Sequence, residues 1–352
     1  MTEQITISLD AMGGDNAPEM VIEGARLAQE RCPGVHFLLY GDEHRIRPHL
    51  GPDTAGSWDI RHTDKVVSAD AKPSQALRKG SKTSMRLAID AVRDGLASGV
   101  VSAGNTGALM AMSKFSLRTL PGIYRPAIAS KIPTMRGEMV MLDLGANIQC
   151  DADTLVQFAI MGADYAHYFL GLQRPTVGLL NVGEEELKGN DTVRAAHDML
   201  RGLDVSGFEY FGFVEGNDIT KGTVDVVVTD GFTGNIALKS MEGTARLMES
   251  TLRTAYQSGW RSKLGYLFSQ SALKALRKKM DPNNYNGAIF LGLNGIAVKS
   301  HGGTDARGFA NAIGIAFNMV NDGMIDQIRA DFEDVVQRSA VASREAAAGG
   351  GV

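Results

Sequence analysis

The sequence predicts an α/β protein with a three-layer fold, in which helices cover both faces of a doubly wound, mostly parallel β-sheet. First, apolar strand patterns alternate with helical patterns along most of the 352 residues. Second, several strand candidates, such as VHFLLY at 35–40, are apolar throughout, which is typical of strands buried on both faces. Third, 41 glycines accompany only 10 prolines, which fits many tight strand-to-helix turns.

The first half of the chain alternates regularly. A short strand leads into a glycine turn, and Pro18 then begins a helix because proline is favoured in the first helical turn. We expect strands at 5–9, at 35–40, at 60–68, at the apolar start of 100–112, at 127–133 and at 139–144. We expect helices at 18–29, 84–96, 109–120 and 152–170.

The second half begins in the same way, with strands expected at 176–182, 208–213 and 224–229 and a helix at 192–200. The pattern then changes to a long helix at 236–257, an aromatic segment at 259–268 and a basic helix at 271–280, which together predict a helical hairpin inserted over 236–282. A strand at 288–299 and a helix at 307–321 follow. We therefore expect one two-lobed domain over 1–342 and a disordered tail over 343–352.

The composition restricts the partners and the compartment. A formal net charge of −4 and a pI near 6.0 give no general attraction to nucleic acid or to anionic membranes, so any anion site must be local. The cysteines are Cys32 and Cys150, and no signal peptide or membrane-spanning run is evident, so a reducing cytoplasm is expected. Cys150 is interpreted as a buried structural thiol rather than as a nucleophile.

Two loops share the spacing Gly-x-Thr-Gly, and each lies between an apolar run and a helical pattern. Glycine lets bare N–H groups approach a ligand, and the N-terminus of the following helix favours an anion such as phosphate. Each loop alone is also compatible with an ordinary strand-to-helix turn, but two of them suggest two walls of one cleft. The candidate residues are Ser102, Gly104, Asn105, Thr106 and Gly107 in the first loop and Asp230, Gly231, Thr233, Gly234 and Asn235 in the second.

Ligands of open α/β sheets bind beyond the carboxyl ends of the strands. This rule predicts a single rim that gathers the turns 10–15, 102–107, 143–147, 181–190 and 229–235, with Lys188 and His301 nearby. Such a rim binds anions and stabilises a developing oxyanion with amide donors. A basic stretch at 69–85 is either a solvated loop or a lid that brings cations over the anion, and its cations are Lys72, Arg78, Lys79 and Lys82.

Several common mechanisms lack their motifs in this chain. There is no GxGxxG after a strand, no GxxxxGK[ST], no GxSxG, no HExxH and no cysteine pair at metal-binding spacing. These absences argue against a dinucleotide dehydrogenase, a P-loop kinase, a serine hydrolase and a zinc enzyme.

Nine segments of the chain together form a specific pattern. They are DAMGGD (10–15), KPSQALR (72–78), VSAGNTGALM (101–110), VMLDLGAN (140–147), VQFAIMG (156–162), LNVGEEELKG (180–189), DGFTGN (230–235), NYNGA (284–288) and KSHG (299–302). With these segments the chain resembles the bacterial phosphate acyltransferase family of phospholipid synthesis. The resemblance runs from about residue 5 to about residue 330, and Gly303 replaces the alanine or serine that is usual there.

The resemblance implies transfer of a fatty acyl group from acyl-[acyl carrier protein] to inorganic phosphate, which gives acyl phosphate and the free carrier. Phosphate is itself the nucleophile in this reaction, so neither a metal nor a cofactor is expected. The product would feed the membrane glycerol-3-phosphate acyltransferase, and hence phosphatidic acid synthesis. The implied fold is similar to the isocitrate and isopropylmalate dehydrogenases and to phosphotransacetylase. Two alternatives are an isopropylmalate-type oxidoreductase, which needs a carboxylate cluster and a nucleotide loop, and a non-catalytic acyl-carrier or lipid-binding scaffold.

Roles for individual residues follow from the resemblance. Lys188 would neutralise phosphate or the oxyanion, unless it forms a surface ion pair with Glu184 or Glu185. Asn235 and the amides of 231–234 would donate to the oxyanion, unless they only cap a helix. His301 would protonate the leaving thiolate or serve a structural role. The first glycine loop would cradle phosphate, and the residues expected mainly to shape loops are Asp10, Asp15, Asp143, Asn147 and Asp230.

The hairpin suggests two kinds of contact. Its apolar positions at helical spacing need a partner, and a homodimer is the simplest one; these positions are Met241, Ala245, Met248 and Leu252. The tip mixes aromatic, apolar and basic residues, so it is packed core, a transient contact with membrane lipids, or a dock for the acidic carrier protein. The tip residues are Trp260, Arg261, Lys263, Leu264, Leu267, Phe268, Arg277 and Lys278.

Overall fold

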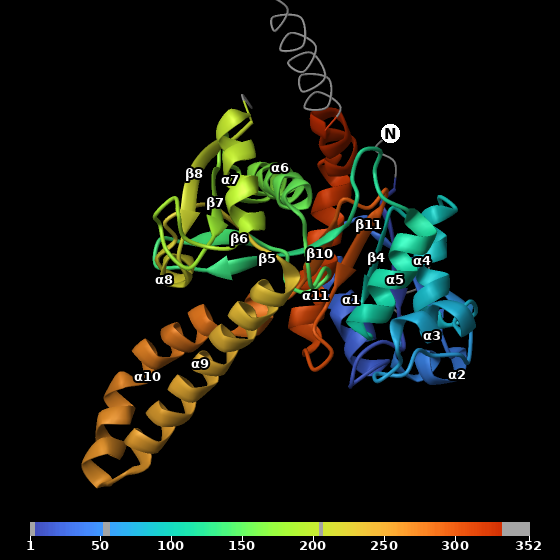
Figure 1. The fold of residues 1–352 in the computed structure, drawn as a ribbon. Helices are drawn as coiled ribbons and strands as arrows, with labels where there is room; N and C mark the ends of the chain where they lie inside the picture. Colours follow the sequence, from blue (N-terminus) through green and yellow to red (C-terminus); the bar gives the residue numbers. More distant parts are fainter. Residues whose placement is uncertain (1–3, 52–56, 204–206, 333–352) are drawn as a thin grey trace, which may run out of the picture.

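The computed structural model describes residues 4–51, 57–203 and 207–332, without the side chains of 277–280 and 282 (Figure 1). The tail expected at 343–352 and the end of the expected domain at 333–342 lie outside the described residues.

Eleven strands form one sheet in the order β3-β2-β1-β4-β11-β10-β5-β6-β9-β7-β8. Apolar residues alternate between its two faces, so that Val100 belongs to one buried cluster and Val101 to the other. The strands are β1 (Thr6–Asp10), β2 (His36–Gly41), β3 (Trp58–His62), β4 (Gly99–Ser102), β5 (Ala127–Pro133), β6 (Glu138–Leu142), β7 (Thr176–Leu180), β8 (Glu209–Val214), β9 (Val226–Val228), β10 (Ala288–Leu291) and β11 (Ile296–Lys299).

Helices cover both faces of this sheet, as the sequence predicts (Figure 1). In the first lobe, formed around β1–β4 and β11, helices α1 and α11 pack together on one face and α4 and α5 on the other. The helices are α1 (Glu19–Arg31), α2 (Glu43–Ile46), α3 (Pro73–Lys79), α4 (Ser84–Arg93), α5 (Thr106–Leu117), α6 (Ala152–Leu170), α7 (Asp191–Gly202), α8 (Gly216–Lys221), α9 (Gly231–Gln257), α10 (Trp260–Met280) and α11 (Ala306–Asn321).

Three antiparallel pairings at the centre of the sheet correct the prediction of a single rim. The pairs β11–β10, β10–β5 and β5–β6 are antiparallel, whereas all the other pairs are parallel. Three reversals turn β6, β9, β7 and β8, the second lobe, against the direction of the first lobe. The carboxyl ends of β1, β4 and β11 therefore lie at one rim and those of β6, β9 and β7 at the other.

The predicted hairpin is present but longer than expected. Helix α9 begins at Gly231 rather than at 236, and α10 joins the aromatic segment and the basic segment into one helix. The pair projects away from both lobes (Figure 1). The strand expected at 288–299 is instead the antiparallel hairpin β10–β11.

Candidate functional site

Asp10 anchors the rim of the first lobe from inside. Its carboxylate accepts hydrogen bonds from the Ser84 hydroxyl at 2.6 Å and from the Ser102 hydroxyl at 2.7 Å. Ser102 Oγ in turn accepts from the Gly104 amide at 3.0 Å. Burial raises the pKa of Asp10, although both serine hydroxyls favour its charged form. Asp10 and Ser102 therefore fix the start of the first glycine loop, and the Ser102 hydroxyl is already donated.

Asn105 ties the first glycine loop to the preceding basic stretch. Its side-chain oxygen caps α5 by accepting from the Ala108 amide at 2.9 Å, and its Nδ2 donates to the carbonyls of Ala69 and Ala71 at 2.7 and 3.2 Å. Thr106 is exposed at the first turn of α5. Gly107 is needed because a Cβ there would lie 2.8 Å from the ring of Pro73.

Asp143 organises the rim of the second lobe. Its Oδ1 accepts from the amides of Ile128, Gly145 and Ala146 at 3.0, 3.1 and 2.9 Å. Its Oδ2 accepts from the amide and the Nδ2 of Asn147 at 2.7 and 2.9 Å. Burial raises the pKa of Asp143 against the effect of these donors. The residue thus holds the whole turn after β6.

The second glycine loop forms the first turn of α9. Asp230 caps this helix by accepting from the Thr233 amide at 2.7 Å, while the Gly231 amide donates to Asn147 O and the Gly234 amide to Asp230 O. These three amides, which the sequence analysis assigned to an oxyanion, are therefore occupied in this structure. The glycines allow close packing instead, because a Cβ on Gly234 would lie 1.9 Å from Asp143 O.

Asn235 and Lys188 lie on the same rim as Asp143. Asn235 is exposed on α9, and its side chain lies over Gly145, 3.7 Å from where a Cβ on that glycine would be. Lys188 follows β7, which pairs with β9 beside β6. Its side chain is exposed and, within the described residues, pairs with neither Glu184 nor Glu185.

The turn after β11 supplies the third part of the site. The amide of Asp15 donates to the carbonyl of Gly302 at 2.9 Å, and Asn286 holds the turn by accepting from the His301 amide at 2.8 Å. His301 Nδ1 accepts from the Gly303 amide at 3.1 Å, so the proton of the neutral ring is on Nε2. Burial and the cations of Lys239 and Lys299 lower the pKa of His301. A neutral imidazole with a donor at Nε2 results.

Sequence reasoning missed Lys299 and Lys239 as individual site residues. Lys299 Nζ donates to the carbonyls of Ser300 and Ala103, the latter at 3.4 Å, and burial lowers its pKa to about 8 against the effect of Asp10 and Asp15. The positive charge of Lys239, on α9, lowers the pKa values of both Lys299 and His301. The KSHG motif contained the only available signal for Lys299, because its burial depends on pairing between distant strands.

Helix α9 connects the two rims. Its first turn contacts the Asp143 turn through the Gly231 amide and Asn235, and one turn later Lys239 lies close enough to Lys299 and His301 to lower both pKa values. The candidate site is therefore the region along the base of α9. It brings together one neutral histidine, several cations and an amide side chain, a set that can hold an anion and donate to an oxyanion.

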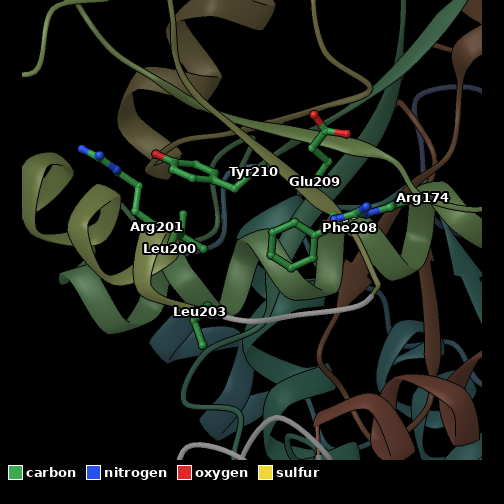
Figure 2. A pocket seen from close by; sticks show the side chains of 7 residues that line it. All are labelled: Arg174, Leu200, Arg201, Leu203, Phe208, Glu209 and Tyr210. Carbon is green, nitrogen blue, oxygen red and sulfur yellow. Dashed lines mark hydrogen bonds between the residues drawn. The ribbon is translucent and has the colours of Figure 1, made fainter.

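Two other features lie apart from this chemistry. Burial, followed by the charges of Asp143 and Asp230, raises the pKa of Cys150 to about 12, so its thiol is protonated and unsuited to nucleophilic attack. Figure 2 shows a groove of about 310 Å³ at the start of β8 and the end of α7, lined by Arg174, Leu200, Arg201, Leu203, Phe208, Glu209 and Tyr210. It lies at the N-terminal end of β8, whereas Lys188 lies beyond the carboxyl end of the parallel strand β7.

The tip of the hairpin is exposed, so within this chain it is not packed core. Trp260, Leu267 and Phe268 are 69, 60 and 88% exposed, and Leu264, Arg261 and Lys263 are also exposed. An edge-to-face contact between Tyr256 and Tyr266, with ring centroids 5.6 Å apart, joins the two helices near this end. Arg277 and Lys278 belong to α10, but their side chains lie outside the described part of the chain.

Residues 4–51, 57–203 and 207–332 lack two further features. No group of three or more His, Cys, Asp or Glu residues in this part of the chain could hold a metal ion. Among the helices of residues 4–51, 57–203 and 207–332, none is both long and apolar enough to cross a bilayer.

The sequence matches one protein family over nearly its whole length. The family described as "Fatty acid synthesis protein" matches residues 5–327. A protein named "Phosphate acyltransferase" from Paramagnetospirillum magneticum is 57% identical over 351 residues, which cover 99% of each chain. Another of that name from Rhodospirillum centenum is 60% identical over 331 residues, which cover 94% of this chain and 93% of the relative.

Solved structures share the fold at low identity. A phosphotransacetylase from Streptococcus pyogenes is 20% identical with a TM-score of 0.61, over 92% of this chain and 95% of that one. A branched-chain phosphotransacylase from Enterococcus faecalis is 16% identical with a TM-score of 0.57, over 90% and 99%. These similarities concern the fold alone. They confirm the predicted three-layer, phosphotransacetylase-like α/β architecture.

Proposed function

Because the chain belongs to the phosphate acyltransferase family, we propose that it transfers a fatty acyl group from an acyl-[acyl carrier protein] thioester to inorganic phosphate. The observation that carries this proposal is the match over 99% of both chains to a protein of that name. The chain is thus an acyltransferase. The relatives' names give no support to the isopropylmalate-type oxidoreductase or to the non-catalytic scaffold.

The reaction uses phosphate itself as the nucleophile. A phosphate oxygen attacks the thioester carbonyl carbon, the carbonyl oxygen becomes an oxyanion, and the carbon–sulfur bond then breaks to give acyl phosphate and the carrier thiolate, which takes up a proton. The protein has to hold phosphate in line with the thioester and donate hydrogen bonds to the oxyanion. Thioesters are already activated, so this positioning supplies the principal catalytic effect.

The site residues fit these tasks in the following way. Lys188, exposed and without an acidic partner among its neighbours Glu184 and Glu185, neutralises phosphate or the oxyanion. Asn235, exposed over Gly145, donates to the oxyanion. His301 donates a hydrogen bond from its Nε2–H group to the leaving sulfur, and the neutral ring keeps this proton. Asp10, Asp143 and their partners position the loops rather than react, because carboxylates facing phosphate would repel it.

We place the product in phospholipid synthesis, where a membrane glycerol-3-phosphate acyltransferase would consume acyl phosphate on the way to phosphatidic acid. The exposed tip of the hairpin supports transient membrane contact, since aromatic residues beside cations favour the headgroup region. The chain would then be cytoplasmic and peripheral to the membrane. Replacement of Leu264, Leu267 and Phe268 by serine should weaken binding to anionic liposomes while soluble turnover persists; unchanged liposome binding would remove this role.

The hairpin also supports a homodimer. Met241, Ala245 and Leu252 are half-buried, but Leu247 and Met248 on the same helix are 67 and 50% exposed. A second copy packed along α9 would cover them. Sedimentation equilibrium should give a dimer, and Leu247→Lys with Met248→Lys should shift it towards monomer. A wild-type monomer at micromolar concentration would contradict this proposal.

The proposed function is tested by detecting acyl phosphate directly with mass spectrometry. Acyl phosphate should appear only when the protein, an acyl thioester and phosphate are all present, and chelator should not reduce the rate. A requirement for a nicotinamide nucleotide or for a divalent metal would contradict the proposal.

The proposed site is tested separately with Lys188→Ala and Asn235→Ala. Each should lose about 10²- to 10³-fold in turnover, the usual effect of removing one preorganised donor, while the free energy of unfolding stays near that of the wild type. Normal turnover in both variants would place the reaction elsewhere on the molecule.

A further inference from the structure

The segment between β3 and α4 is locally basic in a chain whose formal net charge is −4. Residues 64–82 contain five Lys or Arg and two Asp. Lys72, Arg78, Lys79 and Lys82 are exposed, and none of them forms an ion pair with a described residue. Arg78 contacts only the Ser74 carbonyl of its own helix, at 3.4 Å. We call these four residues the α3 basic face.

In the neighbouring helix α4, by contrast, arginines form ion pairs with nearby aspartates. Arg86 pairs with Asp90 at 2.8 Å, and Arg93 pairs with Asp90 and Asp94 at 2.9 and 2.8 Å. Arginines that stabilise the lobe are thus matched by carboxylates. The α3 basic face has no such match, so internal ion pairing does not explain it.

This face is fixed to the first glycine loop. Asn105 of the loop donates to the carbonyls of Ala69 and Ala71, and the ring of Pro73 at the start of α3 lies against Gly107. The other end is held by the Thr63 hydroxyl, which donates to the Lys82 carbonyl at 2.7 Å. The backbone that carries the cations is therefore fixed against the first glycine loop, at the rim of the first lobe.

From this placement we infer that the α3 basic face is the docking surface for the acidic carrier protein that presents the thioester. The inference rests on the proposed function, which requires a carrier whose acyl group reaches the site on a flexible arm. Exposed, unpaired cations around a site steer and orient an acidic partner. A membrane surface fits less well, because Val66 is the one large apolar residue of 64–82 exposed by more than a third, at 44%.

The test uses Arg78→Glu, Lys79→Glu and the double variant, with Lys114→Glu as the matched control. Lys114 is exposed in the last turn of α5, eight residues from the first, which corresponds to about 12 Å along the helix. Binding of the holo carrier protein is measured by fluorescence anisotropy at low and raised ionic strength. Turnover is measured with the acyl-carrier thioester and with a short acyl thioester of N-acetylcysteamine.

Each single reversal should weaken carrier binding about 3- to 10-fold and the double variant more than about tenfold, with a smaller difference at raised ionic strength. Turnover of the short thioester should stay at the wild-type rate, and Lys114→Glu should behave as wild type. Equal losses with the short thioester would instead assign the cations to phosphate, and would overturn the inference.

Carrier affinity that is unchanged in the double variant, or wild type that binds no carrier, would also overturn it. Failure of the proposed function gives a different result. Wild type would then form no acyl phosphate from either thioester, while the anisotropy measurement would still decide whether the face binds the carrier.

Discussion

Asp143→Asn gives a sharp test of how the second rim is held. The substitution keeps the shape of the side chain and the Oδ1 acceptor used by three backbone amides. It places an NH2 group where Oδ2 now accepts from the amide and the Nδ2 of Asn147, at 2.7 and 2.9 Å. Rotating the asparagine amide by 180° would be less favourable, because its NH2 group would then face the backbone N–H groups of Ile128, Gly145 and Ala146.

The expected loss follows from these two contacts. A hydrogen bond to a charged group contributes about 1.5–3 kcal/mol, so the free energy of unfolding should fall by about 3–6 kcal/mol. Asp230→Asn is the control, since Asp230 is less buried than Asp143 and its side chain accepts a hydrogen bond from the Thr233 amide at 2.7 Å. Asparagine caps helices as well as aspartate does, so this loss should stay below about 0.5 kcal/mol.

Urea denaturation followed by circular dichroism measures both variants, with the slope of the transition compared to confirm that the same surface is exposed. If the free energy of unfolding fell no more in Asp143→Asn than in Asp230→Asn, the proposed role of the Asp143 carboxylate in stability would be contradicted. This result would mean that the turn after β6 is held by backbone contacts alone.

Three further predictions concern the base of α9 and its surroundings. Gly234→Ala should lower turnover by about 10²-fold, because the new Cβ would lie 1.9 Å from Asp143 O and helix α9 would have to move. The control Gly243→Ala should keep wild-type turnover, because no atom lies within 4 Å of the new Cβ. Equal rates in the two variants would contradict this prediction. Burial lowers the pKa of Lys299 from 10.5 to about 8, so between pH 8 and pH 10.5 the unfolded chain binds more protons than the folded chain. Over this range the free energy of unfolding of the wild type should rise with pH by up to roughly 3 kcal/mol more than that of Lys299→Met. Parallel pH profiles of the two proteins in urea titrations would contradict this prediction. Cys150→Ser should keep turnover, and the wild-type thiol should react slowly with iodoacetamide at pH 8 because its pKa is about 12; fast alkylation with loss of activity would assign it a catalytic role.

Local signals predicted those elements whose ends are set by neighbouring residues. Helix α6 spans Ala152–Leu170, the range read from the sequence, because Asp151 caps its start and Gly171 ends it in the left-handed conformation at φ 69°. Asp143 was expected to shape a loop, and its hydrogen bonds are consistent with that expectation.

Long-range pairing was not visible in the same way. The run 288–299 has the composition of one strand, but Gly292 adopts φ +86° and turns the chain back, so β10 and β11 pair antiparallel. Missing this turn, together with the antiparallel pairing of β5 with β6, led to the incorrect prediction of a single rim. The burial of Lys299 was hidden for the same reason, because it depends on pairing of Lys299 with Ser102 across β11 and β4.

The glycines of 230–235 show a third limit. Their spacing suggested free amides for an oxyanion, yet Gly231 and Gly234 are required by the close approach of the Asp143 turn. A sequence shows that a position lacks a side chain, but it does not show which atoms occupy the space. Of the oxyanion donors expected from the sequence, the structure therefore leaves the Asn235 side chain available and occupies the amides of Gly231, Thr233 and Gly234.

The central claim is that phosphate attacks the thioester directly, without an acyl-enzyme. Rapid-quench measurement of carrier thiol released from excess acyl-carrier thioester, in buffer freed of phosphate, tests it most directly. No thiol should be released above the rate without protein until phosphate is added. A burst of about one thiol per protein chain without phosphate, with the acyl mass found on the protein, would contradict it.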